Sequence, residues 1–236
     1  MAPVAIVAGA VRGTGSVVAV RLAEAGWDVA VLCADGAGNA DTVHRVRAVG
    51  RRALAVETDV TDAVSVQAAL DRVCAELGDP GVLVNSVGVI ACGAPGEASE
   101  EDWNAVVGRS LRGLFVTSRA VTDLMIRQGR GRIVTIANLL GPAEGGPHDH
   151  ATVLAGMAGF TRTVALELRA FDITVNAVAP APPVVGMQAP AAPTAADPEG
   201  SRCATQAAEA VLFLVGGGAS SVTGQTVQVG DEEAAA

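Results

Sequence analysis

The stretch that most constrains the fold is residues 4–26, where an apolar run is followed by a glycine-rich loop and then by helical periodicity. The first five residues of this stretch are all apolar, which suits a strand buried on both faces. The loop glycines are Gly9, Gly13 and Gly15. This order of elements points a helix N-terminus at a phosphate, and the missing Cβ atoms let a pyrophosphate approach the backbone. The stretch predicts a dinucleotide-binding loop, although its Gly-x-x-x-Gly-x-Gly spacing also suits a tight turn without a ligand.

Strands and helices alternate along the rest of the chain. Further strands are expected at residues 28–32, 53–57, 82–84, 132–136, 173–178 and 226–229. Helices are expected at 41–49, between Asp62 and Gly78, and at 100–127, 152–170 and 205–215. Such alternation predicts an α/β fold with a seven-stranded parallel, doubly wound sheet. We assign residues 1–230 to a single Rossmann-like domain and expect the acidic tail, 231–236, to be disordered.

Glycines and polar residues recur where the predicted strands end. They are the 9–15 loop, Asp59, residues 85–88, Asn138 and residues 180–185. In a doubly wound sheet, ligands bind beyond the carboxyl ends of the strands. We therefore expect these segments to border the binding site.

Composition excludes several classes of function. The net charge of −9 and the lack of a basic stripe argue against a nucleic-acid-binding protein. No charged segment followed by an apolar core marks a secretory signal. The longest charge-free stretch, 173–196, holds five prolines and so does not form a membrane-spanning helix. The four scattered cysteines form no Cys-x-x-Cys motif, and we expect buried thiols of a cytoplasmic protein rather than disulfides or zinc ligands.

Motifs along almost the whole chain resemble those of the short-chain dehydrogenases/reductases, in particular the β-ketoacyl-[acyl-carrier-protein] reductases. They are the glycine loop, Asp59-Val60, Asn-Ser-Val-Gly at 85–88, Trp103, Arg-Gly-Leu-Phe at 112–115, Gly-Arg-Ile-Val-Thr-Ile at 131–136, the segments 159–168 and 175–180, and Val-Thr-Gly-Gln at 222–225. The resemblance implies NAD(P)H as the cofactor and a carbonyl substrate that is a small molecule or is bound to a carrier.

The resemblance also implies which residues meet the cofactor. They are Gly9, Arg12, Gly13, Thr14, Gly15, Asp35, Asp59, Val60, Asn85, Gly88, Pro180 and Val185. Ala181 follows Pro180 where the family has glycine, and Val185 stands where it has threonine. The end of the second strand, 32–35, offers neither the acid expected for NAD nor an arginine suited to NADP. The choice between the two cofactors therefore stays open.

The largest departures from the family lie at the positions of its catalytic residues. The family uses an Asn–Ser–Tyr–Lys set, and the matching positions here hold Ser110, Asn138, His150 and Leu154. The chain contains no tyrosine at all, and its sixteen basic residues are all arginine. In the family, the tyrosine passes a proton to the substrate carbonyl, while the lysine lowers the pKa of that tyrosine and holds the cofactor ribose. A leucine can do neither, so the usual proton relay cannot operate.

The replacing residues admit alternative interpretations. His148 and His150, on either side of Asp149, have the chemistry of general acids or bases near neutral pH. They are equally compatible with solvated loop residues, and as a metal pair they lack a clear third ligand. Asn138 could bond a carbonyl oxygen or cap the next segment. Ser110 could join them in catalysis, although space-filling or a bond within its own helix suits it better.

Three functions fit this sequence. The first is a repurposed enzyme that acts on a ketide-like or other small carbonyl compound, with His150 in place of the tyrosine. The second is a non-catalytic subunit that stabilises an active ketoreductase of the same fold, and the third is a cofactor-independent isomerase or cyclase. Family members commonly pair through the helices expected at 100–127 and 152–170, which are apolar on more than one face here. A homo- or hetero-oligomer is therefore expected.

Overall fold

The computed structural model describes residues 2–10, 13–34, 39–90, 99–140, 148–180 and 198–230. Seven strands form one parallel sheet in the order β3-β2-β1-β4-β5-β6-β7. The strands are β1 (Val4–Ala8), β2 (Asp28–Cys33), β3 (Ala53–Glu57), β4 (Pro80–Ile90), β5 (Gly131–Leu140), β6 (Ile173–Pro180) and β7 (Thr226–Val229). The predicted α/β class and the doubly wound parallel sheet are confirmed.

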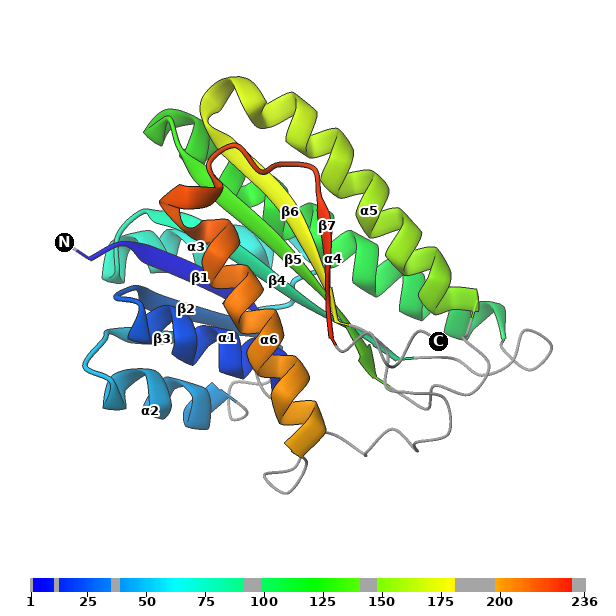
Figure 1. Cartoon of the computed structure of the whole chain (residues 1–236), viewed down its shortest axis with the longest axis horizontal. Helices are drawn as coiled ribbons and strands as arrows, with labels where there is room; N and C mark the ends of the chain where they lie inside the picture. Colours follow the sequence, from blue (N-terminus) through cyan, green and yellow to red (C-terminus); the bar gives the residue numbers. More distant parts are fainter. Residues whose placement is uncertain are drawn as a thin grey trace.

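Helices cover both faces of the sheet (Figure 1). They are α1 (Gly13–Glu24), α2 (Ala40–Ala48), α3 (Ala63–Glu76), α4 (Glu100–Gln128), α5 (His148–Leu168) and α6 (Pro198–Val215), with short 3-10 turns at Arg169–Phe171 and Gly217–Ala219. One face is covered by α1, α2 and α6, and the other by α3, α4 and α5. Strand order reverses between β1 and β4, so the switch point lies where α1 begins.

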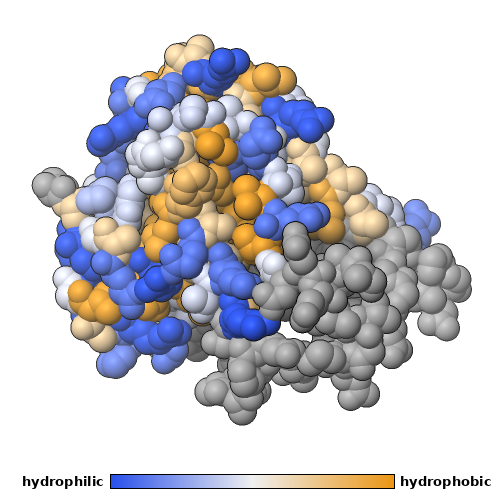
Figure 2. All heavy atoms as spheres, viewed as in Figure 1, coloured by the Kyte–Doolittle hydropathy of each residue, from blue (hydrophilic) through white to orange (hydrophobic). Residues whose placement is uncertain are grey.

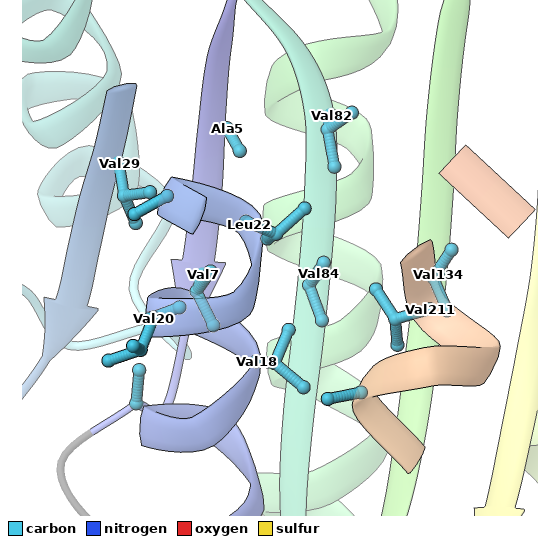
Figure 3. Packing of buried hydrophobic residues seen from close by; sticks show 14 of the residues in the cluster. Ala5, Val7, Val18, Val20, Leu22, Val29, Val82, Val84, Val134 and Val211 are labelled. Atoms are coloured by element: carbon cyan, nitrogen blue, oxygen red, sulfur yellow. The ribbon is translucent and has the colours of Figure 1, made fainter. Parts of the chain in front are cut away.

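Each face of the sheet has its own hydrophobic core, because the strands are buried on both sides. All five residues of β1 are buried. Figure 3 shows Val18 and Leu22 of α1 lying over the central strands, with Val211 of α6 beside β5. On the opposite face, Leu70 of α3 and Met125 of α4 belong to a second buried cluster. The two cores hold the carboxyl ends of the central strands in fixed positions.

Two central strands and two helices are longer than the sequence indicates. β4 and β5 continue to Ile90 and Leu140 and remain paired along the added length. Since β1 ends opposite Asn85, β4 extends five residues beyond its neighbour. Helix α5 begins at His148 rather than residue 152, and α6 begins at Pro198 rather than residue 205. The added residues of β4 and β5 extend the sheet beyond the end of β1.

Two helices begin at residues whose side chains cap them. Asp62 precedes α3 and accepts hydrogen bonds from the backbone amides of Val64 and Ser65. Ser99 precedes α4 and accepts a bond of 3.1 Å from the amide of Asp102. Each cap satisfies amides that have no partner within the helix.

The three cysteines in the described ranges form no disulfide with one another. Cys33 is buried, while Cys74 and Cys203 are half-buried; Cys92 lies outside the described residues. Burial, together with the nearby carboxylate of Asp79, raises the pKa of the Cys74 thiol to about 11. This thiol therefore stays protonated and unreactive at neutral pH.

Apolar residues also reach the surface. Figure 2 shows apolar side chains emerging over the region of α6 and β7, bordered by charged groups. Four large apolar side chains are at least half exposed, namely Val64 of α3 at 77%, Leu166 of α5 at 70%, Phe213 of α6 at 58% and Phe115 of α4 at 50%. None of the helices in the described ranges is long and apolar enough to cross a membrane.

Candidate functional site

The glycine loop forms a tight cradle at the end of β1. Gly9 has a positive φ of 84°, and its amide donates a hydrogen bond of 2.8 Å to the carbonyl of Leu32. A Cβ on Gly9 would collide with the carbonyl oxygen of Ser86 in β4. A Cβ on Gly15 would lie 2.8 Å from the carbonyl oxygen of Gly9 and 2.9 Å from Ser86 Oγ. Both positions therefore require glycine for a packing reason visible in the structure.

Helix α1 starts inside this loop. Gly13, with a φ of 62°, is its first residue, and Thr14 and Gly15 follow in its first turn. The amides of a first helical turn have no partners within the helix and attract anions. The structure thus brings four predicted cofactor residues, Gly9, Gly13, Thr14 and Gly15, to one helix N-terminus; Arg12 lies outside the described residues.

A second group of polar side chains borders the cradle on the side of β2 and α2. Asn39 is fully buried, and its Nδ2 donates to Cys33 Sγ at 2.6 Å. Its Oδ1 is buried and has no hydrogen-bond partner among the described residues. Thr42 is also fully buried, and its Oγ1 lies 3.0 Å from the Ala10 carbonyl and 2.8 Å from Ser16 Oγ. These bonds fix α2 against the glycine loop.

The sequence did not single out Asn39, because an asparagine before a helix usually serves as an N-cap. It occupies the N-cap position of α2 but makes no capping hydrogen bond with its side chain. An unsatisfied buried acceptor is costly, so Asn39 Oδ1 stands out among the described polar atoms near the glycine loop. Asp35, which the resemblance placed near this point, lies outside the described residues.

Asp59 and Val60 follow the end of β3. Asp59 Oδ1 accepts hydrogen bonds from the amide and hydroxyl of Thr61 at 2.9 and 2.7 Å. These bonds, followed by the charges of Arg109 and Arg112, lower the pKa of Asp59. Val60 packs against α4, since a Cβ on Gly113 would lie 3.2 Å from its Cγ2. Asp59 thus carries its charge in a turn stabilised by its own neighbours.

Asn85 of β4 is a buried link between the sheet and α4. Its Oδ1 accepts a bond of 2.8 Å from Thr117 Oγ1, and its Nδ2 donates to Ser118 Oγ at 3.3 Å. The side chain is therefore engaged within the protein. Gly88 pairs in register with Asn138 of β5, and Pro180 is the half-buried last residue of β6. Val185 and the side chain of Asn138 lie outside the described residues.

Leu154, at the position that the resemblance assigns to the lysine, has apolar neighbours. Leu154 of α5 is half-buried and packs against an apolar cluster between α4 and α5. We call this the α4–α5 cluster; it consists of Val106, Val107, Leu111, Leu114, Ala137, Val153, Leu154, Met157 and Phe160. The two helices approach closely there, because a Cβ on Gly156 would lie 2.9 Å from Leu111 Cδ1. Ser110, at the asparagine position, is 6% exposed on α4.

His148 and His150 are the first and third residues of α5. Their backbone thus lies in the first turn of a helix and not in a loop, while their side chains lie outside the described part of the structure. Among the described residues, no three His, Cys, Asp or Glu side chains are grouped so as to hold a metal ion.

Comparisons with known proteins agree with this architecture. The sequence model of the short chain dehydrogenase family matches residues 3–196. The chain is 38% identical over 235 residues to the short-chain dehydrogenase/reductase family member NovK of Streptomyces niveus, covering 97% of this chain and 95% of that relative. It is 34% identical over 242 residues to the 3-oxoacyl-[acyl-carrier-protein] reductase FabG of Staphylococcus aureus, with 95% of each covered.

The solved structures give the same result. An actinorhodin polyketide ketoreductase variant with NADPH matches with a TM-score of 0.81 at 30% identity, over 96% of this chain and 95% of that chain. The family match covers more than half of the chain, and both sequence relatives are matched over nearly their full length. The chain belongs to the short-chain dehydrogenase family.

Proposed function

We propose that this chain is a non-catalytic subunit of the short-chain dehydrogenase fold, which stabilises an intact relative of the β-ketoacyl reductase type. The observation that carries the proposal is the setting of Leu154. Where the resemblance places the lysine, this side chain is half-buried and packs in the α4–α5 cluster. An apolar side chain packed among apolar neighbours supports the fold and supplies no charge or hydrogen bond.

The loss of the proton relay removes most of the expected chemistry. General acid–base catalysis contributes about 10²–10⁴ in rate, and the chain has neither the tyrosine nor the lysine to supply it. A bound nicotinamide dinucleotide would supply a hydride, but the substrate oxygen would still need a proton. Ser110 is buried on α4 and no described side chain donates or accepts a hydrogen bond with it.

Helices α4 and α5 have the properties of an association surface. Phe115 and Leu166 are about half or more exposed on the same face of the sheet. Helix α4 has acidic residues in its first turn, Glu100, Glu101 and Asp102, and Arg127 in its last turn. An antiparallel pairing with the same helix of a similar chain would therefore set acidic ends against basic ends. A partner of the same fold fits this charge distribution.

The substrate of the assembly would be a carbonyl thioester. This part of the proposal is supported by the name of the Staphylococcus aureus relative, a 3-oxoacyl-[acyl-carrier-protein] reductase. The NADPH in the actinorhodin ketoreductase structure likewise supports a nicotinamide dinucleotide as reductant. In this proposal, the intact partner binds both in its productive site.

Co-expression tests the proposal. A tagged chain is expressed with an intact reductase of this family from the same genome, purified and assayed with NADPH and a β-ketothioester. We expect the two chains to co-purify, and activity to disappear when the tyrosine of the intact partner is replaced. His150→Ala in this chain should leave activity unchanged. No association, or activity from this chain in the absence of the partner, would overturn the proposal.

A second function, a repurposed enzyme, is favoured by one observation. Residues 148–150 form the start of helix α5, so the backbone at the position of the family's tyrosine is helical. A general acid at His150, together with Asn138, would then act on a carbonyl compound, with or without a dinucleotide. If this function is the real one, His150→Ala lowers the activity of the natural assembly at least about a hundredfold.

A further inference from the structure

We propose that the chain binds the adenosine diphosphate half of a nicotinamide dinucleotide and leaves the nicotinamide half without a specific site. The nucleotide is then a structural ligand of the subunit and not its hydride donor. This inference rests on the proposed function and names the ligand class of the same site. It follows from a contrast between the two halves of the site.

The phosphate side of the site keeps the geometry that a pyrophosphate requires. A Cβ on Gly9 or Gly15 would collide with Ser86 of β4 or with the loop itself, so glycine at both positions keeps the close turn at the end of β1. Helix α1 begins at Gly13, so the free amides of its first turn face the same loop. An anion at this point is stabilised by the helix dipole and by direct amide bonds.

The adenosine side adds a buried acceptor. Asn39 Oδ1 has no partner among the described residues, although the residue is fully buried. Its Nδ2 bonds to Cys33 at the end of β2, and Leu32, one residue earlier, accepts the amide of Gly9. Asn39 thus lies near the phosphate cradle. A ribose hydroxyl of the adenosine half would supply the donor that this oxygen lacks.

The nicotinamide side has lost the group that would bind its ribose. The resemblance assigns that role to a lysine at the position of Leu154, whose neighbours are the apolar side chains of the α4–α5 cluster. A leucine cannot accept or donate a hydrogen bond to a ribose hydroxyl. The nicotinamide half gains no polar contact at this position. Removing that half from the ligand should therefore change the dissociation constant little.

Calorimetric titration of the chain tests the contrast directly. NADH is compared with ADP-ribose, and NADPH with 2′-phospho-ADP-ribose, so that each dinucleotide has its own nicotinamide-free counterpart. For whichever pair binds, we expect dissociation constants within about threefold of each other. A dinucleotide that binds at least about tenfold more tightly than its counterpart would overturn the inference, as would no binding of either pair at about 5 mM.

A pair of matched variants gives a second test. Leu154→Lys restores an ammonium at a half-buried position, from which a lysine can reach polar groups with its flexible stem. We expect this variant to prefer the dinucleotide over its counterpart by about tenfold, through charge-assisted bonds to the ribose. The control, Leu166→Lys, adds the same charge to the exposed face of α5 and should change neither constant. Equal effects of both lysines would contradict the inference. If Leu154→Lys does not fold, the wild-type comparison decides alone.

The outcomes separate this inference from the proposed function. If the chain binds a dinucleotide and its nicotinamide-free counterpart equally but associates with no partner, the inferred binding of the adenosine diphosphate half stands and the proposed subunit function is wrong. If the chain strongly prefers the dinucleotide, co-purifies with an active partner and has no turnover of its own, the inference about the nicotinamide half is wrong and the proposed subunit function stands.

Discussion

At the scale of single residues, Asp28 is a buried charge held by two arginines. Its side chain is 3% exposed at the start of β2, and it binds Arg51 at 2.6 Å and Arg52 at 2.7 Å. Burial alone would raise the pKa of Asp28, but the hydrogen bonds from Arg52 and the charges of both arginines outweigh it. The pKa in the folded state is therefore lower than in the unfolded chain.

The lowered pKa predicts a pH-dependent contribution to stability. Because Asp28 binds a proton more readily when unfolded, its stabilising effect is complete above the unfolded pKa, near 4, and is lost as the pH falls through the folded value. Asp28→Asn should lower the free energy of unfolding by about 2 kcal/mol at pH 7, less than for a fully buried pair because Arg52 is half-exposed.

Urea denaturation at pH 7 and pH 3 measures this contribution. The difference between wild type and Asp28→Asn should shrink at pH 3, because Asp28 of the unfolded chain then binds a proton and the wild type loses that part of its stability. Asp71→Asn, at an exposed position on α3, serves as the control and should change little at either pH. A cost for Asp28→Asn that is the same at both values would show that its charge is not responsible.

Gly15 gives a residue-scale prediction for nucleotide binding. A Cβ at this position would lie 2.8 Å from the Gly9 carbonyl oxygen and 2.9 Å from Ala10 Cα, so the loop must move to accept it. Gly15→Ala should weaken ADP-ribose binding by at least about tenfold in calorimetry. Thermal unfolding of the same sample checks that the variant is folded. Unchanged affinity in a folded variant would mean that the cradle does not hold the phosphates.

The sequence was informative about residues whose role is local. The spacing of the glycines placed Gly9 and Gly15 at the cradle, and Asp62 and Ser99 belong to the residue types that favour helix caps. Asn39 and Asp28 could not be identified in this way. Asp28 depends on arginines more than twenty residues away, and the unsatisfied oxygen of Asn39 becomes visible only when its surroundings are known.

At the scale of elements, the centres of strands and helices were predicted better than their ends. Asn85 and Ser86 interrupt the apolar run of β4, so the sequence suggested a strand that stops before them. The structure continues the strand because residues 85–90 pair with residues 135–140 of β5. Pairing between distant segments outweighs local composition. For α6, the neglected signal is Pro198, since proline is favoured in the first turn of a helix.

Helix α4 offers a matched pair of glycine substitutions. A Cβ on Gly108 would have nothing within 4 Å, whereas on Gly113 it would lie 3.2 Å from Val60 Cγ2. Gly108→Ala should therefore raise the free energy of unfolding by about 0.5–1 kcal/mol through helix propensity alone. Gly113→Ala should gain less or lose stability. Chemical denaturation of both variants checks the order, and a larger gain at Gly113 would contradict the packing between Val60 and α4.

At the scale of the whole molecule, the proposed function requires a partner on α4 and α5. Phe115→Arg places a charge in the exposed centre of α4 and should weaken association with a co-expressed intact relative by at least about tenfold. Val49→Arg, at the end of α2 on the opposite face of the sheet, is the control. Light scattering and co-purification yield measure the effect. Equal retention of the partner by both variants would place the interface elsewhere.

A non-catalytic subunit has no ketoreductase chemistry of its own. The most direct measurement is the consumption of NADPH by the purified chain alone, with a β-ketoacyl N-acetylcysteamine thioester as substrate. We predict no consumption above the background without enzyme, and the same result for His150→Ala. Steady turnover by the chain alone, reduced about a hundredfold or more by His150→Ala, would contradict the proposed function and identify the chain as a repurposed enzyme.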